Sequence, residues 1–192
     1  VSQKYPTTIV AACEDIDHAR EIQKLFSNDY FRVYSGSDII GVEIGGAAKN
    51  IIAIAAGICY GLGYGDNTMA ALVTRGLEEI IRLGTTLGAK RDTFSGLSGM
   101  GDLIVTAFSP HSRNRQVGER IGQGESLNDI LADMEMVAEG VETARSIHDL
   151  TQKNKIEMPI SEQIYKVLFK DIPPRNAILE LMGRELVDEH LV

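Results

Sequence analysis

The chain has 192 residues, a length that corresponds to one domain or slightly more. Its 19 lysines and arginines stand against 27 aspartates and glutamates, which gives a net charge of −8, and 44% of the residues are hydrophobic. This composition excludes a chain that is disordered overall, and the acidic balance argues against nucleic acid as a partner. An anionic small substrate is still compatible with the sequence if positive side chains gather locally.

Two features favour a reducing, cytoplasmic location. Cys13 and Cys59 lie far apart in apolar segments and form neither a metal-ligand spacing nor a disulfide framework. No charged segment followed by an apolar one opens the chain, so no signal peptide is predicted. Because the chain begins at Val1 and runs directly into a strand-like segment, we expect it to be a piece of a longer protein.

The first 37 residues predict a β-α-β unit. Residues 7–12 are rich in β-branched side chains, residues 15–26 carry apolar side chains at helical spacing, and residues 31–35 alternate as a second strand. Two parallel strands are only a fragment of a sheet, so we interpret residues 1–37 as the stub of an α/β domain.

From residue 38 onward the pattern predicts helices alone. Residues 39–63 are apolar almost all round, which is typical of a buried helix, and the charge-free stretch 51–63 is expected to be too short for a transmembrane segment. Asp66 or Asn67 is predicted to cap a second long helix. The charged side chains expected on the solvent face of that helix are Arg75, Glu78, Glu79 and Arg82.

Shorter helices complete the predicted domain, which is all-helical and covers residues 38–192. They are expected at 102–107, 112–121, 127–134, 139–153, 161–169 and 175–187.

Lys49 is the first candidate for chemistry. It follows Gly45 and Gly46 on the apolar helix, where a lysine must reach solvent, pair with a carboxylate or lose its proton. Burial favours the neutral amine, which suits general acid–base catalysis, and the two glycines let a ligand or another backbone come close. A purely structural pairing with a buried acid explains the same pattern, and the residues alone leave both interpretations open.

Asp102 and Thr106 form the second candidate. Asp102 follows the glycine pair Gly99 and Gly101, which we take to be flexible, and Thr106 lies one helical turn further on the same side. An aspartate after glycine is often only a helix cap. A functional interpretation needs a partner for this carboxylate, and Lys49 would be one.

A helix start with positive charge is the third candidate. Ser112 is a plausible cap, and Arg113, Asn114 and Arg115 follow it in the first turn. Backbone N–H groups, a guanidinium and an amide together suit a phosphate monoester, although a solvated charged turn has the same composition.

Other patterns argue against further kinds of site. The histidines are scattered, without the spacing of a metal site, at His18, His111, His148 and His190. The glycine-rich stretch 61–65 follows a helix rather than a strand, which favours a turn between helices over a dinucleotide-binding loop.

Five separated segments together resemble the C-terminal half of the bacterial-type glycerol-3-phosphate dehydrogenases. They are GVEIGGAAKNIIAIAAG, GYGDNTMAALVTRGLEEIIRLG, SGMGDLIVTAFSPHSRNR, VAEGVETA and MPISEQIYKVL, and they occur in order over nearly the whole chain. The resemblance implies a mainly α, multi-helix domain like the C-terminal domain of 6-phosphogluconate dehydrogenase, at residues 38–192. Residues 1–37 would then be the β-α-β end of a Rossmann domain whose glycine loop lies outside this chain.

The resemblance also implies an activity. It is the interconversion of sn-glycerol 3-phosphate and dihydroxyacetone phosphate with NAD or NADP, a step that supplies glycerophospholipid precursors. Without the cofactor-binding loop, and without a second substrate-binding lysine that the family carries in the same domain, the 192 residues by themselves are expected to be inactive.

By the same resemblance Lys49 is the general acid–base and Asp102 tunes it. Asn50 and Thr106 belong to the same substrate-binding cluster, and the phosphate would be held by Ser112, Arg113 and Asn114. The residues that would contact the cofactor from the helical side are Arg113, Val137 and Glu139.

Two alternatives are kept. Another hydroxyacid dehydrogenase of the same superfamily would use Lys49 equally but would not need the phosphate-binding group. A non-catalytic helical dimerisation module would pair Lys49 with Glu43 or another acid and would leave no cavity around it. The apolar faces of the long helices could also support a homodimer.

Overall fold

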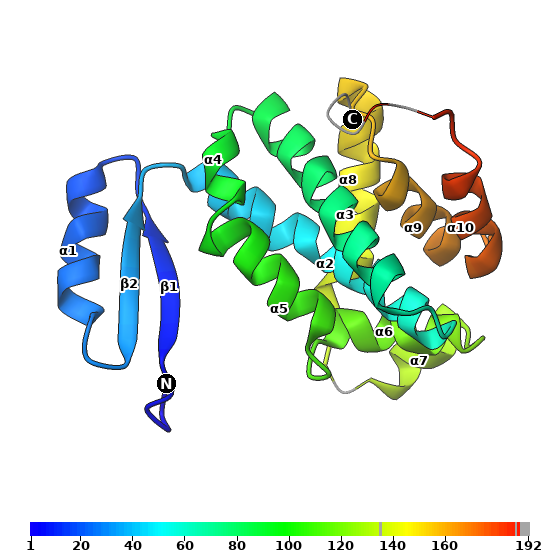
Figure 1. The fold of residues 1–192 in the computed structure, drawn as a ribbon, viewed down its shortest axis with the longest axis horizontal. Helices are drawn as coiled ribbons and strands as arrows, with labels where there is room; N and C mark the ends of the chain where they lie inside the picture. The colour runs from blue at the N-terminus through cyan, green and yellow to red at the C-terminus, as the bar shows by residue number, and fades with distance from the viewer. Residues whose placement is uncertain (135, 187, 189–192) are drawn as a thin grey trace.

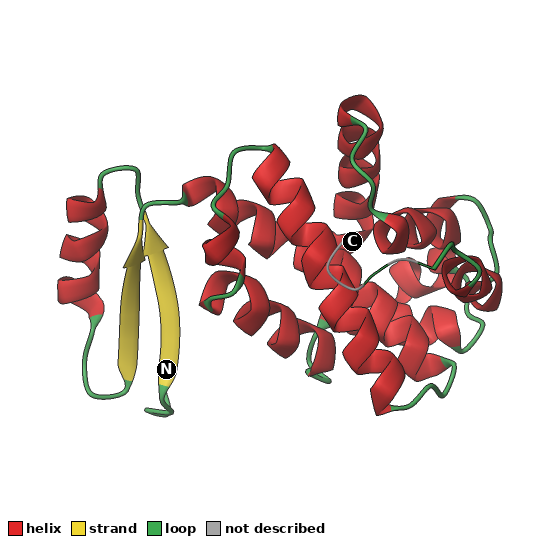
Figure 2. Cartoon of the chain, turned by 45° about the horizontal axis from the view of Figure 1, so that its top comes forward, coloured by secondary structure: helices red, strands yellow, loops and turns green. Residues whose placement is uncertain are grey.

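The computed structural model describes residues 1–134, 136–186 and 188. A small α/β unit at the N-terminal end stands beside a larger body made of helices (Figure 1). The two strands are confined to that end of the molecule (Figure 2). The predicted fold class, mainly α behind a short β-α-β unit, is therefore confirmed.

The α/β unit follows the sequence pattern closely. Strands β1 (Thr7–Ala12) and β2 (Phe31–Gly36) pair in parallel, and α1 (Ile16–Phe26) connects them. Asp15 caps α1 by accepting a hydrogen bond from the N–H of Asp17, and Gln23 on α1 donates to the carbonyl of Val33. Because the described part of the chain forms only two strands, large apolar side chains such as Leu25 stay exposed.

The helical body is built around α2 (Ile39–Gly61), which runs through its middle (Figure 1). The other elements are α3 (Asp66–Thr86), α4 (Arg91–Phe94), the π-helical turn η1 (Leu97–Gly101), α5 (Asp102–Phe108), α6 (Arg113–Gly122), α7 (Leu127–Asp133), α8 (Glu139–Asn154), α9 (Pro159–Phe169) and α10 (Pro174–Met182). Helices α3, α5, α6, α8 and α9 all contact α2 or pack on its neighbours. The nearly uniform apolar surface of α2 is thus matched by partners on most sides.

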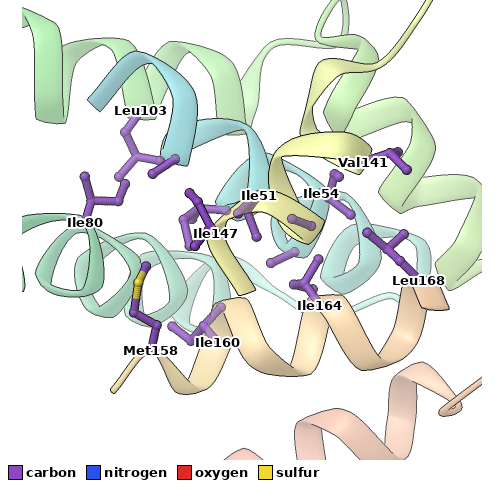
Figure 3. Close-up of a cluster of buried hydrophobic side chains, with 14 of the residues drawn as sticks. Ile51, Ile54, Ile80, Leu103, Val141, Ile147, Met158, Ile160, Ile164 and Leu168 are labelled. Atoms are coloured by element: carbon purple, nitrogen blue, oxygen red, sulfur yellow. The ribbon is translucent and has the colours of Figure 1, made fainter. Parts of the chain in front are cut away.

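The core lies where α2 meets these helices (Figure 3). Ile51 and Ile54 of α2 are fully buried, and Leu103 of α5, Val141 of α8 and Ile164 of α9 pack into the same cluster. Burying one such side chain contributes roughly 1.5–3 kcal/mol. The core therefore fixes the positions of the helices that carry the predicted site residues.

Helix α2 passes, by length and composition, as a helix that could cross a membrane. It has 23 residues, with a mean hydropathy of 1.6 over its most apolar window, and is thus longer than the charge-free stretch 51–63 on which the expectation rested. More than half of that window, 56%, is buried inside the protein. A central core helix has the same composition as a membrane span, and the packing accounts for the apolar character of α2.

Both cysteines are free thiols, as expected. Cys59 is buried with Met69 and Ala107, and burial raises the pKa of its thiol to about 11. A thiol with such a pKa stays protonated and acts as an apolar packing group.

Several element boundaries differ from the prediction. The sequence pattern missed α4 and η1, which are only one turn each. Helix α3 begins at Asp66 after Gly65 and has no side-chain cap, so neither Asp66 nor Asn67 is the capping residue. Helix α10 ends at Met182, where the Gly183 N–H bonds back to Leu179, and residues 187 and 190, named in the prediction, lie outside the described residues.

Glu79 is the clearest error of the sequence-based prediction. It was expected on the solvent face of α3, but it is only 3% exposed. Its carboxylate accepts hydrogen bonds from the N–H groups of Ile160 and Ser161 and from the Ser161 hydroxyl, at the first turn of α9. The partners lie 81 and 82 residues further along the chain, so no local pattern marks Glu79 as buried.

Candidate active site

Lys49 and Asp102 form an ion pair in the middle of the helical body. Lys49 extends from α2, and Asp102 is the first residue of α5. The Lys49 side chain is 19% exposed and the Asp102 side chain 34%, so solvent still reaches the pair. Lys49 therefore pairs with Asp102 rather than with Glu43, and it is not sealed in the core.

Glycines bring these two residues together by close packing. A Cβ atom on Gly45 of α2 would lie 2.6 Å from the carbonyl oxygen of Ser98 in η1. A Cβ atom on Gly99 would lie 2.1 Å from the carbonyl oxygen of Phe94. The π-helical turn can thus lie directly against α2, and it delivers Asp102 to Lys49. The interpretation of Gly99 and Gly101 as a flexible pair was wrong, because Gly99 is tightly enclosed.

Thr106 supports Asp102 from one turn further along α5. Its hydroxyl donates to the backbone carbonyl of Asp102 at 2.6 Å and lies 3.5 Å from the carboxylate oxygen Oδ1. The Asp102 carboxylate therefore has a hydroxyl beside one oxygen and the Lys49 ammonium on the other.

A chain of amide hydrogen bonds joins three helices beside Lys49. Asn114 of α6 donates to Oδ1 of Asn50 on α2 at 2.9 Å, and its own Oδ1 accepts from the N–H of Gly140 on α8, also at 2.9 Å. Both asparagines are buried. A side chain on Gly140 would collide with Asn114, since its Cβ would lie 2.7 Å from Oδ1. Part of the hydrogen-bonding capacity of Asn114 is thus used to align α2, α6 and α8.

The start of α6 carries the predicted anion-binding group. Ser112 caps the helix by accepting from the N–H of Arg115 at 3.3 Å, as expected. Arg113 donates one guanidinium N–H to the carbonyl of Val137 at 2.9 Å, which leaves further donors of the fork for other partners. Glu139 follows as the first residue of α8.

These groups surround a cavity of about 390 Å³, which we call the site cavity. Its walls come from α2, α5, α6 and the start of α8. The lining residues are Gly46, Lys49, Asn50, Val105, Thr106, Ser109, His111, Ser112, Arg113, Asn114 and Glu139. Asp102 and Val137 are the predicted site residues that do not line it, and each contacts a residue that does.

Sequence reasoning missed two polar lining residues, Ser109 and His111. Both lie in the turn before α6, and their nearness in sequence to Ser112 was the signal that could have found them. Gly46 also lines the cavity, and a Cβ atom there would meet nothing within 4 Å, which fits the expectation that a ligand comes close.

A second cavity, of about 440 Å³, lies between the β-α-β unit and the helical body. Asp38 stands at its edge, where it accepts from the N–H groups of Gly41 and Lys90 and from the Thr93 hydroxyl. The bond from Gly41 caps α2, and the bonds from Lys90 and Thr93 attach this cap to α4. None of the predicted site residues lines this cavity.

The rim of the site cavity fits contact with a large polar cofactor. Val137 is 70% exposed, Glu139 is exposed, and Arg113 holds the Val137 backbone in place. Among the described residues no group of three or more histidine, cysteine, aspartate or glutamate side chains could hold a metal ion. Lys49, Arg113 and the start of α6 line the cavity, and side chains and helix ends of these kinds suit proton transfer and anion binding.

The fold and the cavity define a helical substrate-binding domain with a lysine–carboxylate pair beside a positively charged helix start. Residues 38–179 match the family described as the C-terminus of NAD-dependent glycerol-3-phosphate dehydrogenase. The chain belongs to this family, as its sequence motifs indicated.

Curated relatives agree with this assignment. Glycerol-3-phosphate dehydrogenase (NAD(P)+) of Solidesulfovibrio magneticus is 54% identical over 189 residues, which are 98% of this chain and 57% of the relative. The protein of the same name from Lysinibacillus sphaericus is 56% identical over 180 residues, or 94% of this chain and 53% of the relative. The chain spans just over half the length of these relatives.

Solved structures show the same fold. The crystal structure of glycerol-3-phosphate dehydrogenase from Coxiella burnetii superposes with a TM-score of 0.91 at 38% identity, over 95% of this chain and 56% of that one. The yeast glycerol-3-phosphate dehydrogenase structure has a TM-score of 0.85 at 26% identity, over 95% of this chain and 56% of that one.

Proposed function

We propose that this chain is the substrate-binding part of an enzyme that interconverts sn-glycerol 3-phosphate and dihydroxyacetone phosphate with NAD or NADP. The observation that carries the proposal is the site cavity, where the Lys49–Asp102 pair and the start of α6 share one space. A proton donor and a phosphate-binding group in one cavity suit a small phosphorylated ketone. The names of the curated relatives support the same reaction.

The phosphate binds at the start of α6. Backbone N–H groups and the positive end of the helix dipole attract an anion there, and Arg113 adds a charged, directed donor. Ser112 and Asn114 complete this group, Ser112 by holding the helix start and Asn114 by fixing it against Asn50. With the phosphate held there, the remainder of a three-carbon substrate extends along the cavity toward Lys49.

Lys49 acts as the general acid–base. During reduction its ammonium donates a proton to the C2 carbonyl oxygen of dihydroxyacetone phosphate, and during oxidation its amine takes the proton from the C2 hydroxyl. NAD(P), when bound, supplies or accepts the hydride at C2. Asp102 orients Lys49 through their ion pair, and Thr106 orients Asp102.

Arg113, Val137 and Glu139 contact the cofactor from the helical side. Arg113 and Glu139 line the site cavity, and Arg113 holds the exposed Val137 beside it, which supports this assignment. We also propose that residues 1–37 are the end of a dinucleotide-binding domain and that residues 38–192 form the substrate domain. The change from the parallel strand pair to α2 at Ser37 and Asp38 supports that boundary.

The alternatives are less well supported. Another hydroxyacid dehydrogenase would not need a phosphate-binding helix start, and a non-catalytic module would not need a cavity around Lys49.

A role in glycerophospholipid precursor synthesis in the cytoplasm follows from the proposed reaction, and two free cysteines are consistent with a reducing compartment. Homodimer formation through exposed apolar faces stays part of this proposal.

The test is oxidation of NADH and NADPH by the full-length gene product in the presence of dihydroxyacetone phosphate. Lys49→Met should lower kcat by about 10²–10⁴-fold, the usual contribution of a positioned acid–base group. Lys153→Met, an exposed lysine near the end of α8, is the matched control and should retain turnover. Absence of turnover with either cofactor would indicate that the enzyme acts on the substrate of another member of the superfamily.

A further inference from the structure

His111 lies in a rigid turn at the edge of the site cavity. Its backbone N–H donates to the Ser109 hydroxyl at 3.2 Å, and the N–H of Ser112 donates to the Ser109 carbonyl at 3.1 Å. The Gln116 side chain also donates to the carbonyl of Pro110 at 2.8 Å. These bonds and the fixed φ of proline hold the turn in one conformation, so His111 lines the cavity from a defined position.

The imidazole ring of His111 has no hydrogen-bond or ion-pair partner among the residues that the structure describes. Two other histidines behave differently, since His148 contacts Glu162 at 2.7 Å and His18 lies 3.5 Å from Asp15. His111 lines the site cavity and is exposed, so its ring nitrogens are available to a ligand.

The charges around the cavity nearly cancel without His111. Lys49 from α2 is paired with Asp102 from α5. Arg113 from α6 and Glu139 from α8 have opposite charges and line the same space. A phosphate monoester brings a charge of about −1.5 to −2 at neutral pH, which this set does not balance. His111 is the remaining titratable side chain among the lining residues.

We propose that His111 is a specificity-determining residue, which donates an imidazole N–H to the phosphate of a dianionic phosphate monoester. In its protonated form the ring also supplies the missing positive charge. This inference rests on the proposed function, because it places the phosphate beside Ser112 and Arg113.

The experiment is a calorimetric titration of the full-length gene product with sn-glycerol 3-phosphate at pH 6.5 and at pH 8.0. The variants are His111→Gln and His111→Lys, and His18→Gln is the matched control on the distant helix α1. Each variant's Kd is divided by the wild-type Kd at the same pH, because both proteins then meet the ligand in the same protonation state.

For His111→Gln the expected ratio is about tenfold at pH 6.5, the effect of losing one charged hydrogen bond. His111→Lys carries a permanent charge and should bind at least as tightly as the wild type at pH 8.0. His18→Gln should give a ratio near one at both pH values.

The outcomes separate the two proposals. A His111→Gln ratio near one at both pH values overturns the assignment of His111 while the proposed function stands. If the wild type does not bind sn-glycerol 3-phosphate at either pH, the proposed function fails, and the assignment of His111 fails with it.

Discussion

Arg113 joins two parts of the site through one side chain. Its guanidinium lines the site cavity and also donates to the Val137 carbonyl, just before the start of α8. The planar fork of arginine can hold a backbone carbonyl and an anion at the same time, which a lysine cannot do with the same geometry. Under the proposed function, binding of the phosphate and placement of the segment that precedes Glu139 therefore depend on the same residue.

Arg113→Ala should raise the KM for dihydroxyacetone phosphate by about 10- to 100-fold, the equivalent of a lost charged hydrogen bond of about 1.5–3 kcal/mol. Steady-state kinetics with varied substrate and varied cofactor would measure both constants. The cofactor KM should rise as well, because the Val137 backbone loses its tether. Arg91→Ala removes only a surface pair with Glu78 and is the control. An unchanged substrate KM would contradict the phosphate-binding assignment.

At the scale of elements, Glu79 decides how α9 joins the helical body. Its carboxylate occupies the N-terminal end of α9 and satisfies the N–H groups of Ile160 and Ser161, which no residue of α9 itself caps. Arg82, one turn further along α3, donates to the backbone carbonyl of Glu157. A buried acid on one helix thus replaces the local cap of another helix, and α3 and α9 are held in register.

Glu79 also predicts a pH dependence of stability. Burial raises its pKa to about 7 from the usual 4.5, although the Ile160 and Ser161 donors and the Arg82 charge act in the opposite direction. The folded state therefore binds this proton more tightly than the unfolded state. The contribution to the free energy of unfolding is full below about pH 4.5 and is lost as the pH rises through 7.

Glu79→Gln should make the free energy of unfolding less dependent on pH, and urea denaturation at pH 5 and pH 7.5 would measure this. The wild type should lose up to about 3 kcal/mol more than the variant over this interval, since one pKa unit corresponds to about 1.4 kcal/mol. The variant should also be less stable at pH 5, because an amide nitrogen cannot accept from the α9 N–H groups. Glu78→Gln, which alters a partly exposed ion pair, is the control. If the free energy of unfolding changes equally with pH in Glu79→Gln and in the wild type, Glu79 is not the source of the pH dependence.

The elements that the sequence predicted well are those whose signal is local. Strand β1 was expected at residues 7–12 and is found there, because a short β-branched run needs no distant information. The buried state of Glu79 depends on a helix start 81 residues away. The one-turn elements α4 and η1 are too short for any periodicity to appear.

For the candidate site, the sequence predicted which residues to consider but not how they come into contact. Its residue types and its order along the chain resemble a known family, so the set of residues could be named from the sequence. The contact between Lys49 and Asp102, 53 residues apart, requires the close packing of η1 on α2. His111 was passed over because a lone histidine carries no spacing signal, and only the path of the turn after α5 brings it to the cavity.

For the whole molecule, the shape of the site cavity depends on how closely α2 and α6 approach. A Cβ atom on Gly57 of α2 would lie 2.0 Å from the Arg115 carbonyl oxygen, and one on Gly118 of α6 would lie 2.0 Å from the Ile54 carbonyl oxygen. Lys49 lies upstream on α2, and the phosphate-binding group opens α6. The distance between Lys49 and the start of α6, the proposed proton donor and phosphate site, is therefore set by backbone contact between two helices.

Gly57→Ala should force the two helices apart. Overpacking of this kind costs typically about 1–3 kcal/mol, and here both neighbouring atoms belong to backbone that cannot rotate away. Gly46→Ala is a matched control in the same helix, because a Cβ atom at Gly46 meets nothing within 4 Å. That variant should instead gain about 0.5–1 kcal/mol from helix propensity. Thermal unfolding of both variants gives the comparison, and kcat/KM of Gly57→Ala reports whether the cavity widens. If the two substitutions shift Tm equally, the packing of α2 on α6 does not set the geometry of the site.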